Sequence, residues 1–97
     1  MVVISKSIIV EFGQVHVDAA EPLNDWWRIT KGRQWRSLKD IKKDFGSADY
    51  VGNDRYVFNI KGNKYRLVAM IFFDIRTVYI RYIGTHAEYD KTDCTTI

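Results

Sequence analysis

Three strand-like runs between Tyr56 and Tyr89 constrain the fold of this chain more than any other feature. The segment reads YVFNIKGNKYRLVAMIFFDIRTVYIRYIGTHAEY, with β-branched and aromatic residues in each run and turn-forming residues between the runs. Such runs, separated by glycine, asparagine or aspartate, are typical of antiparallel strands joined by short turns. The segment therefore predicts an antiparallel sheet, and the rest of the chain must cover one face of that sheet.

The first turn of this sheet is predicted at Gly62-Asn63, because a glycine followed by asparagine suits a two-residue type II′ hairpin turn. This turn places Phe58 opposite Leu67 and Asn59 opposite Arg66. Since side chains alternate between the two faces of a strand, the hairpin has one apolar and one polar face. The apolar face, which the helices must cover, contains Phe58, Ile60, Tyr65, Leu67, Ala69 and Ile71. The polar face contains Asn59, Lys61, Lys64 and Arg66.

A second turn is predicted over residues 74–77. A loop with an even number of residues pairs Phe73 with Val78. In that register Met70 lies opposite Arg81, which therefore joins the polar face. A loop with an odd number would turn Arg81 toward the helices, where a charge is costly unless it is paired. We therefore expect the even loop and an open sheet surface that bears four cations, namely Lys61, Lys64, Arg66 and Arg81.

The residues before the sheet predict one short strand and two helices. Val2–Ile4 is a β-branched run suited to a strand, and the apolar residues of 8–15 recur at the spacing of a helix that buries one stripe. Asp18 and Glu21 form a capping-box pattern, in which the Asp18 carboxylate accepts a backbone N–H. A second helix is therefore expected from about Ala19 to Thr30, and its tryptophans are expected to pack in the core.

A third helix and a loop are predicted between this helix and the sheet. Leu38, Ile41 and Phe45 repeat at helical spacing and end at Gly46. The small and turn-forming residues of 47–54 indicate a loop. His16, just before the second helix, is expected to be a loop or capping residue.

Length and composition favour a single soluble domain over residues 1–97. The chain has 97 residues, of which 46% are hydrophobic and 28% are charged, and this is ordinary globular composition. Its one cysteine, Cys94, cannot form an internal disulfide, which favours a reducing, cytoplasmic location. The opening residues are too short and too polar for a signal peptide or a membrane span, so no membrane partner is expected. The net charge of +3 permits an anionic partner such as RNA.

The last strand leads into a second capping-box pattern at Thr85-His86-Ala87-Glu88. It predicts a short C-terminal helix with His86 in its first turn. Free N–H groups at a helix start favour a phosphate. Tyr89 lies three positions after His86 and therefore on the same helical face.

Arginine, lysine, histidine and tyrosine together suit the cleavage of RNA by its own 2′-hydroxyl. That reaction needs a base for the hydroxyl proton, cations for the phosphorane charge and an acid for the leaving 5′-oxygen. The sequence has no cluster of carboxylates with metal-ligand spacing, so a route without metal or cofactor is favoured. Since no second histidine is placed to complete an acid–base pair, Lys64 or Tyr89 must take that role. A plain basic binding surface is the alternative.

Three blocks of the sequence resemble HigB-type toxins of the RelE/ParE superfamily of bacterial toxin–antitoxin systems. The blocks are Tyr56–Ile60, Gly62–Val68 and Gly84–Asp90, and weaker similarity extends over most of the chain. The resemblance implies a small RelE-like α+β fold, with an N-terminal strand and helices packed on one face of a mainly antiparallel sheet. It implies cleavage of mRNA on the translating ribosome. It also implies a HigA-type antitoxin with a helix-turn-helix domain, and binding of operator DNA only through the toxin–antitoxin complex.

The resemblance also suggests roles for individual residues. Arg66 falls where RelE-like enzymes carry a catalytic arginine, and His86 and Tyr89 fall where they place an acid–base residue and a tyrosine. Lys64 would act as an electrostatic aid or a base. The remaining cations, Lys61, Arg81 and Arg55, would hold the RNA backbone.

Two other functions stay open at this point. A ParE-like protein would inhibit DNA gyrase through the same fold without cleaving RNA, because a fold alone does not fix a function. A non-catalytic module that binds RNA or the antitoxin is the third possibility.

Overall fold

The structure, a computed structural model, describes residues 1–97 as five strands and four helices. In chain order the elements are β1 (Val2–Ile4), α1 (Lys6–Val15), α2 (Val17–Lys31), α3 (Leu38–Asp44), β2 (Asp49–Gly52), β3 (Arg55–Ile60), β4 (Tyr65–Phe72), β5 (Thr77–Thr85) and α4 (His86–Asp90). None of these helices combines the length and the apolar character that a membrane span requires.

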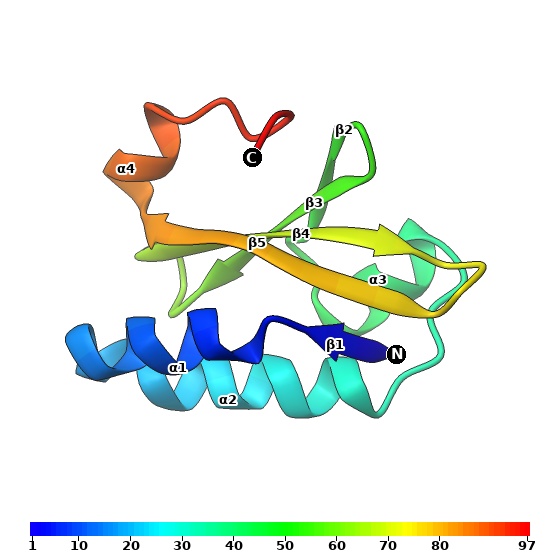
Figure 1. Ribbon diagram of the computed structural model, residues 1–97, viewed down its shortest axis with the longest axis horizontal. Helices are drawn as coiled ribbons and strands as arrows, with labels where there is room; N and C mark the ends of the chain where they lie inside the picture. Colours follow the sequence, from blue (N-terminus) through cyan, green and yellow to red (C-terminus); the bar gives the residue numbers. More distant parts are fainter.

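The strands form a single sheet in the order β1-β5-β4-β3-β2. The pair β1–β5 is parallel and the other three pairs are antiparallel. Helices α1 and α2 lie side by side against one face, whereas α4 and the C-terminal segment lie on the opposite side (Figure 1). The predicted α+β fold is therefore confirmed, with helices on one face of a mainly antiparallel sheet and a short C-terminal helix.

The core lies between the helices and the apolar face of the sheet. An aromatic cluster fills its centre, where Phe58 of β3 contacts Trp26 of α2 at 5.4 Å between ring centres and Phe45 at 5.4 Å. Leu67 of β4 and Ile41 of α3 are fully buried beside this cluster. Trp26 thus packs in the core, as its spacing predicted, whereas Trp27 is only partly buried and packs against the outside of the core.

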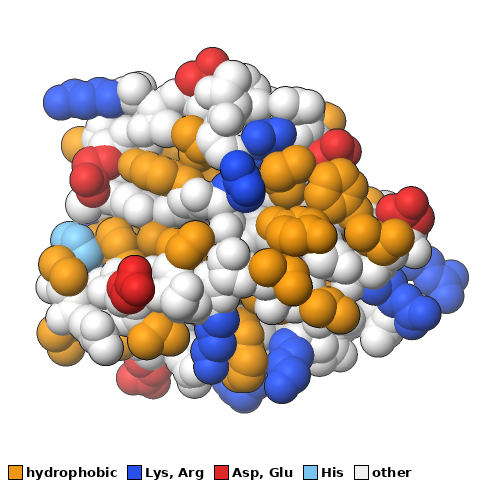
Figure 2. All heavy atoms as spheres, in the orientation of Figure 1, with side chains coloured by type: hydrophobic (Ala, Val, Ile, Leu, Met, Phe, Trp, Pro, Cys, Tyr) orange, Lys and Arg blue, Asp and Glu red, His pale blue; other side chains and the backbone are white.

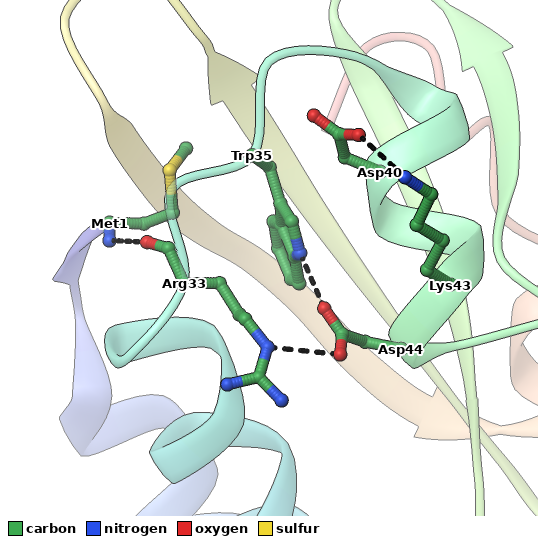
Figure 3. A network of polar contacts seen from close by, with 6 residues as sticks. All are labelled: Met1, Arg33, Trp35, Asp40, Lys43 and Asp44. Carbon is green, nitrogen blue, oxygen red and sulfur yellow. Dashed lines mark hydrogen bonds and ion pairs between the residues drawn. The ribbon is translucent and has the colours of Figure 1, made fainter.

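Polar contacts at the edge of this core join the chain before and after α2 (Figure 3). The main-chain nitrogen of Met1 donates a hydrogen bond to the carbonyl of Arg33. The Asp44 carboxylate accepts hydrogen bonds from Arg33 Nε at 3.0 Å and from Trp35 Nε1 at 2.8 Å. Hydrogen bonds to Asp44 thus tie the α2–α3 connection to the end of α3.

The first hairpin has the predicted register, with Phe58 opposite Leu67 and Asn59 opposite Arg66. The Lys64 N–H donates to the Lys61 carbonyl at 3.2 Å across the turn, and Gly62 has a φ of 63°. A glycine at this position avoids the steric cost of a left-handed backbone. The local turn chemistry was therefore sufficient to fix this pairing.

The second hairpin departs from the predicted register. Its loop has an even number of residues, as expected, because Phe72 pairs with Thr77. However, Met70 pairs with Tyr79 rather than Arg81, and the ladder shifts between Val68 and Ala69. Arg81 is the extra residue of a β-bulge, which places one residue of β5 outside the regular alternation. The predicted pairing of Met70 with Arg81 is therefore wrong.

Two N-terminal predictions are also wrong. The second helix begins at Val17, and Asp18 makes no capping hydrogen bond, because its carboxylate contacts Lys64 and Tyr65 instead. The expected loop over residues 47–54 contains β2, which pairs with β3 through a turn. Asn53 and Asp54 in this turn have φ values of 52° and 64°, which suit a tight hairpin.

The sheet face opposite the helices is partly covered rather than open. Val57, Val68 and Arg55 lie on this face and are at most 7% exposed. The C-terminal segment folds back over Arg55, whose guanidinium donates hydrogen bonds to the main-chain oxygen of Ile97. The expectation of a fully open cationic surface is therefore wrong, because part of that surface is buried under the chain that follows α4.

Candidate active site

Arg66 occupies the centre of the candidate site, on β4 between Asn59 of β3 and Gly84 of β5. Its guanidinium carbon lies 5.0 Å from the ring centre of Tyr89, which α4 brings over this end of the sheet. This distance is within the range of a cation–π interaction. Arg66 forms no ion pair with any carboxylate, and its buried Nε has no hydrogen-bond partner. Its positive charge is therefore not neutralised within the chain.

The glycine opposite Arg66 gives space to a tyrosine ring. A Cβ at Gly84 would lie 2.8 Å from Cζ of Tyr82. This separation is too short for two carbon atoms, so only glycine lets the Tyr82 ring lie across the end of β5 in its present position. The residue at position 84 thus controls the packing next to Arg66.

The start of α4 has the predicted capping box. Thr85 N–H donates to Glu88 Oε1 at 2.9 Å, and Glu88 N–H donates to Thr85 Oγ1 at 3.2 Å. His86 follows directly, and its N–H donates to the Lys64 carbonyl at 3.2 Å. The cap and this backbone hydrogen bond fix the position of His86 at the start of α4.

The imidazole of His86 has a carboxylate partner one helical turn later. His86 Nδ1 lies 3.2 Å from Asp90 Oδ2, and both side chains are about half exposed. A carboxylate on one ring nitrogen orients the ring and leaves the other nitrogen free for a substrate. Asp90 was not among the predicted site residues, although its spacing of four residues from His86 on a helix could have indicated it.

The hydroxyl of Tyr89 points to Cys94, with 3.6 Å between the oxygen and Sγ. Partial burial is the main cause that raises the pKa of Tyr89, and Cys94 raises it further, while the positive charge of Arg66 opposes both. The phenol therefore keeps its proton at neutral pH. Tyr89 can donate a proton or stack on a base, but it is poorly suited to remove a proton.

Lys64 does not share the face of Arg66, contrary to the predicted alternation. Its ammonium group forms an ion pair with Asp18 of α2, on the helix side of the sheet. The Asp18 carboxylate also accepts a hydrogen bond from the Tyr65 hydroxyl at 2.6 Å. The hydrogen bond to Asp18 raises the pKa of Lys64, and the bonds from Lys64 and Tyr65 lower the pKa of Asp18. In this arrangement Lys64 is a cation rather than a base.

The three residues predicted to hold the RNA backbone are in different environments. Lys61 is exposed in the β3–β4 turn and makes no side-chain hydrogen bond. Arg55 is 7% exposed, and its Nε and Nη2 donate to the Ile97 oxygen at 3.1 and 2.7 Å. Arg81 Nε donates to the same oxygen at 3.3 Å. The two arginines thus converge on one position, which the C-terminal segment occupies.

No local pattern indicated that Asp18 belongs to this region, because Asp18 is 46 residues from Lys64 and its own pattern indicated a helix cap. No group of three or more His, Cys, Asp or Glu side chains lies close enough together to hold a metal ion. The candidate residues are Arg66 with Tyr89, and His86 with Asp90, while Lys64 lies on the helix side of the sheet.

Comparison with known proteins identifies the family. The family model described as HigB_toxin, RelE-like toxic component of a toxin-antitoxin system, matches residues 19–92. This range includes every strand and helix that builds the site. The chain belongs to the HigB toxin family.

Individual HigB relatives support this membership. The mRNA interferase toxin HigB of Escherichia coli K12 is 42% identical over 64 residues, which cover 64% of this chain and 61% of that protein. The mRNA interferase HigB of Shigella flexneri matches to the same extent. The mRNA interferase HigB of Escherichia coli O6:H1 is 29% identical over 93 residues, 94% of this chain and 90% of that protein. The match thus spans about 61% of the length of the first relative and nearly all of the last.

Proposed function

We propose that this chain, as a single domain over residues 1–97, is a toxin that cleaves mRNA on the translating ribosome without a metal ion. We further propose that it acts in the cytoplasm and that a HigA-type antitoxin neutralises it and carries the complex to operator DNA. The observation that carries the catalytic proposal is the unneutralised guanidinium of Arg66, which lies against the ring of Tyr89 on α4, the short helix that His86 begins. The names of the HigB relatives supply the substrate class.

The proposed reaction is an attack of the RNA 2′-oxygen on the neighbouring phosphorus. A base removes the 2′-hydroxyl proton, the new P–O bond forms, and the bond to the 5′-oxygen breaks. The products are a 2′,3′-cyclic phosphate and a 5′-hydroxyl, which receives a proton from an acid. The extra negative charge appears on the phosphorane oxygens, so a cation next to them lowers the barrier.

Arg66 is the residue best suited to that charge. Because no carboxylate pairs with it, its charge can be directed at the scissile phosphate. The planar guanidinium donates two parallel hydrogen bonds to phosphate oxygens. The ring of Tyr89 holds the guanidinium from one side and leaves the remaining donors for RNA.

His86 is proposed to transfer a proton. Histidine is the side-chain type that most readily gains and loses a proton near neutral pH. Asp90 contacts Nδ1, so Nε2 is the nitrogen that would face the substrate. Asp90 itself would act as a positioning residue rather than a catalytic one.

Tyr89 and Lys64 have supporting roles in this proposal. The raised pKa of Tyr89 favours the phenol as an acid or as a stacking surface for a base. The raised pKa of Lys64 favours an electrostatic contribution, since the ammonium group stays charged beside Asp18. Because Lys64 stays charged, the second proton-transfer group in this proposal is either Tyr89 or a group on the ribosome or the RNA.

The test is transcript mapping after induction of the protein in bacteria. New 5′ ends spaced by codons are expected for the parent, and about a hundredfold fewer for Arg66→Ala or His86→Ala, because each removes one transition-state interaction. Arg28→Ala is the matched control, since Arg28 is an exposed arginine on α2 paired only with Asp25. Circular dichroism checks that each variant is folded. If both site variants cleave like the parent, the site assignment fails.

Transcript mapping separates the other functions when it is combined with assays of DNA supercoiling, antitoxin binding and cleavage of free RNA. Intact transcripts together with loss of DNA supercoiling would indicate a gyrase inhibitor. Intact transcripts, normal supercoiling and retained antitoxin binding would indicate a non-catalytic module. Cleavage of free RNA by the purified protein at the rate seen with ribosomes would contradict the ribosome requirement.

A further inference from the structure

The strand β1 leaves one edge of the sheet without a partner. It pairs with β5 on one side and is the last strand of the sheet on the other. Val2 N–H donates to the Arg76 carbonyl at 2.7 Å, so the Val2 backbone groups face β5. Because backbone groups of successive residues in a strand point to opposite sides, those of Val3 face the free edge. An unpaired edge of this kind is a template for an additional strand.

A groove of about 740 Å³ lies beside this edge. Its walls come from β1, the end of α2, the start of α1 and the β4–β5 turn, and its lining includes Val3, Trp27 and Ile75. Basic and apolar side chains lie together on the surface over β1 and α2 in the view of Figure 2. The groove thus offers apolar contacts next to unpaired backbone groups.

The charges of this groove are all positive. Lys6 Nζ lies 3.6 Å and Lys31 Nζ 4.8 Å from the ring centre of Trp27, so two ammonium groups are held over one indole. Neither lysine forms an ion pair, and Arg76 bonds only the neutral Gln34. No aspartate or glutamate lines the groove. The groove is therefore complementary to carboxylates.

Apolar side chains next to the groove are unusually exposed. Val2 is 56%, Ile4 is 40% and Ile75 is 59% exposed. They flank the free edge, and contiguous exposed apolar side chains with a polar rim are typical of a protein–protein contact. A partner that covers them needs apolar side chains as well as acidic ones.

We propose that this groove binds an extended acidic segment of the antitoxin, which adds a strand to the free edge of β1 and places carboxylates beside Lys6 and Lys31. Membership of a toxin–antitoxin family supplies the partner, and the groove supplies the chemistry of the segment. The proposal rests on the antitoxin part of the proposed function, but it does not require RNA cleavage.

Two other occupants fit the groove less well. A second copy of the chain would bring the same three cations together, and like charges in one interface are unfavourable. RNA would match the lysines but would leave the backbone groups of Val3 and the exposed Val2 side chain without suitable partners. An acidic polypeptide satisfies all of these groups.

The groove and the active site lie at opposite ends of β5. The groove borders Thr77 at the start of the strand, whereas Gly84 pairs with Arg66 at its end. Gly84 lies seven positions after Thr77, a distance of about 23 Å at roughly 3.3 Å per residue. A segment bound in the groove would therefore hold the antitoxin without itself touching Arg66.

The test measures affinity for the antitoxin encoded in the same operon, purified separately, by isothermal titration calorimetry. For Lys6→Glu/Lys31→Glu we expect binding weaker by about tenfold or more, with a salt dependence reduced relative to the parent. Lys39→Glu/Lys42→Glu on α3 is the control with the same change in charge and should bind like the parent. If charge reversal disturbs folding, the variant Lys6→Gln/Lys31→Gln tests the same contacts instead.

Amide hydrogen exchange tests the strand itself. Val3 N–H should exchange more slowly in the complex by about tenfold or more, because it gains a backbone hydrogen bond. Unchanged affinity of both lysine variants, or weaker affinity with no protection at Val3, would overturn the proposal. Loss of RNA cleavage with unchanged antitoxin binding would assign the groove to RNA, and self-association through β1 would assign it to a second copy; either result overturns the proposal. Failure of RNA cleavage in the parent would leave these binding measurements intact.

Discussion

Asp18 and Lys64, 46 residues apart, form an ion pair that joins the start of α2 to the turn before β4. The carbonyl of Lys64 accepts the N–H of His86, so one residue links the helix layer to the proposed proton-transfer group. Tyr65 adds a second hydrogen bond to the same carboxylate. This contact connects three parts of the chain that no local sequence pattern brings together.

Asp18→Asn should make stability less dependent on pH. The hydrogen bonds from Lys64 and Tyr65 lower the pKa of Asp18, so its contribution is present above the ordinary carboxylate value and is lost as the pH falls through the lowered value. At alkaline pH the raised pKa of Lys64 has the corresponding effect, because stability is lost as the pH rises through that raised value. Thermal unfolding should show Asp18→Asn below the parent at pH 7 and equal to it in strong acid. Asp25→Asn, which removes an exposed helix pair, is the control.

Asp90→Asn should slow catalysis without weakening RNA binding. Asp90 contacts His86 Nδ1 and would hold the ring with its other nitrogen toward the substrate. We expect kcat to fall by about tenfold or more and KM to stay unchanged, because general acid–base catalysis contributes about 10²–10⁴-fold and depends on the position of the ring. Partial rescue by Asp90→Glu would support positioning. Equal changes in KM and kcat would indicate that Asp90 acts on binding instead.

Tyr89→Phe and Tyr89→Ala should differ strongly. The Phe variant keeps the ring against Arg66 and removes only the hydroxyl, which contacts Cys94. We expect the Ala variant to cleave about 2- to 30-fold more slowly and the Phe variant to keep most of the activity, since a cation–π contact contributes about 0.5–2 kcal/mol. Single-turnover cleavage rates measure the difference. A loss of about a hundredfold or more in Tyr89→Phe would instead assign proton transfer to the phenol.

Local patterns predicted the parts of the site that are local in the chain. The turn at Gly62-Asn63 fixed the pairing that puts Arg66 beside Asn59, and the Thr85–Glu88 capping box fixed where α4 begins. Both features depend on residues within a few positions of one another. The family resemblance then gave the α+β fold, because its three blocks coincide with β3, β4 and the β5–α4 junction.

Long-range contacts account for what the sequence did not predict. The bulge at Arg81 breaks the alternation of β5, and alternation was the basis for placing that residue. Asp18 matched a cap locally, but Lys64 and Tyr65 offered stronger partners. The C-terminal segment covers Arg55, and no periodic pattern indicates where a segment without regular structure will lie.

Gly84→Ala should disturb the site more than the fold. The new Cβ would overlap the ring of Tyr82, which must rotate away from the end of β5 next to Arg66. We expect little change in the free energy of unfolding, because the new Cβ meets the far end of a partly exposed side chain that can rotate away, and a larger relative loss of cleavage. Gly46→Ala is the control, because its Cβ would meet only the Lys42 carbonyl at 3.9 Å. Chemical denaturation and cleavage rates are measured on both variants, and Gly84→Ala with parental activity would show that the Tyr82 ring has no part in the site.

RNA binding should release the segment after α4 from the sheet. Arg55 and Arg81 converge on the main-chain oxygen of Ile97, and Asn53 Nδ2 donates to the Thr95 carbonyl at 2.9 Å. A phosphate that takes these guanidinium donors must displace that oxygen, since one position cannot hold both. Amide exchange over residues 91–97 should therefore become faster when a ribosome-bound mRNA with a 2′-deoxy substitution at the cleavage site is added, because this substrate binds but cannot react. The Arg55→Ala/Arg81→Ala variant should show no such change, and an unchanged exchange rate in the parent would mean that the two arginines stabilise the C-terminal segment rather than bind RNA.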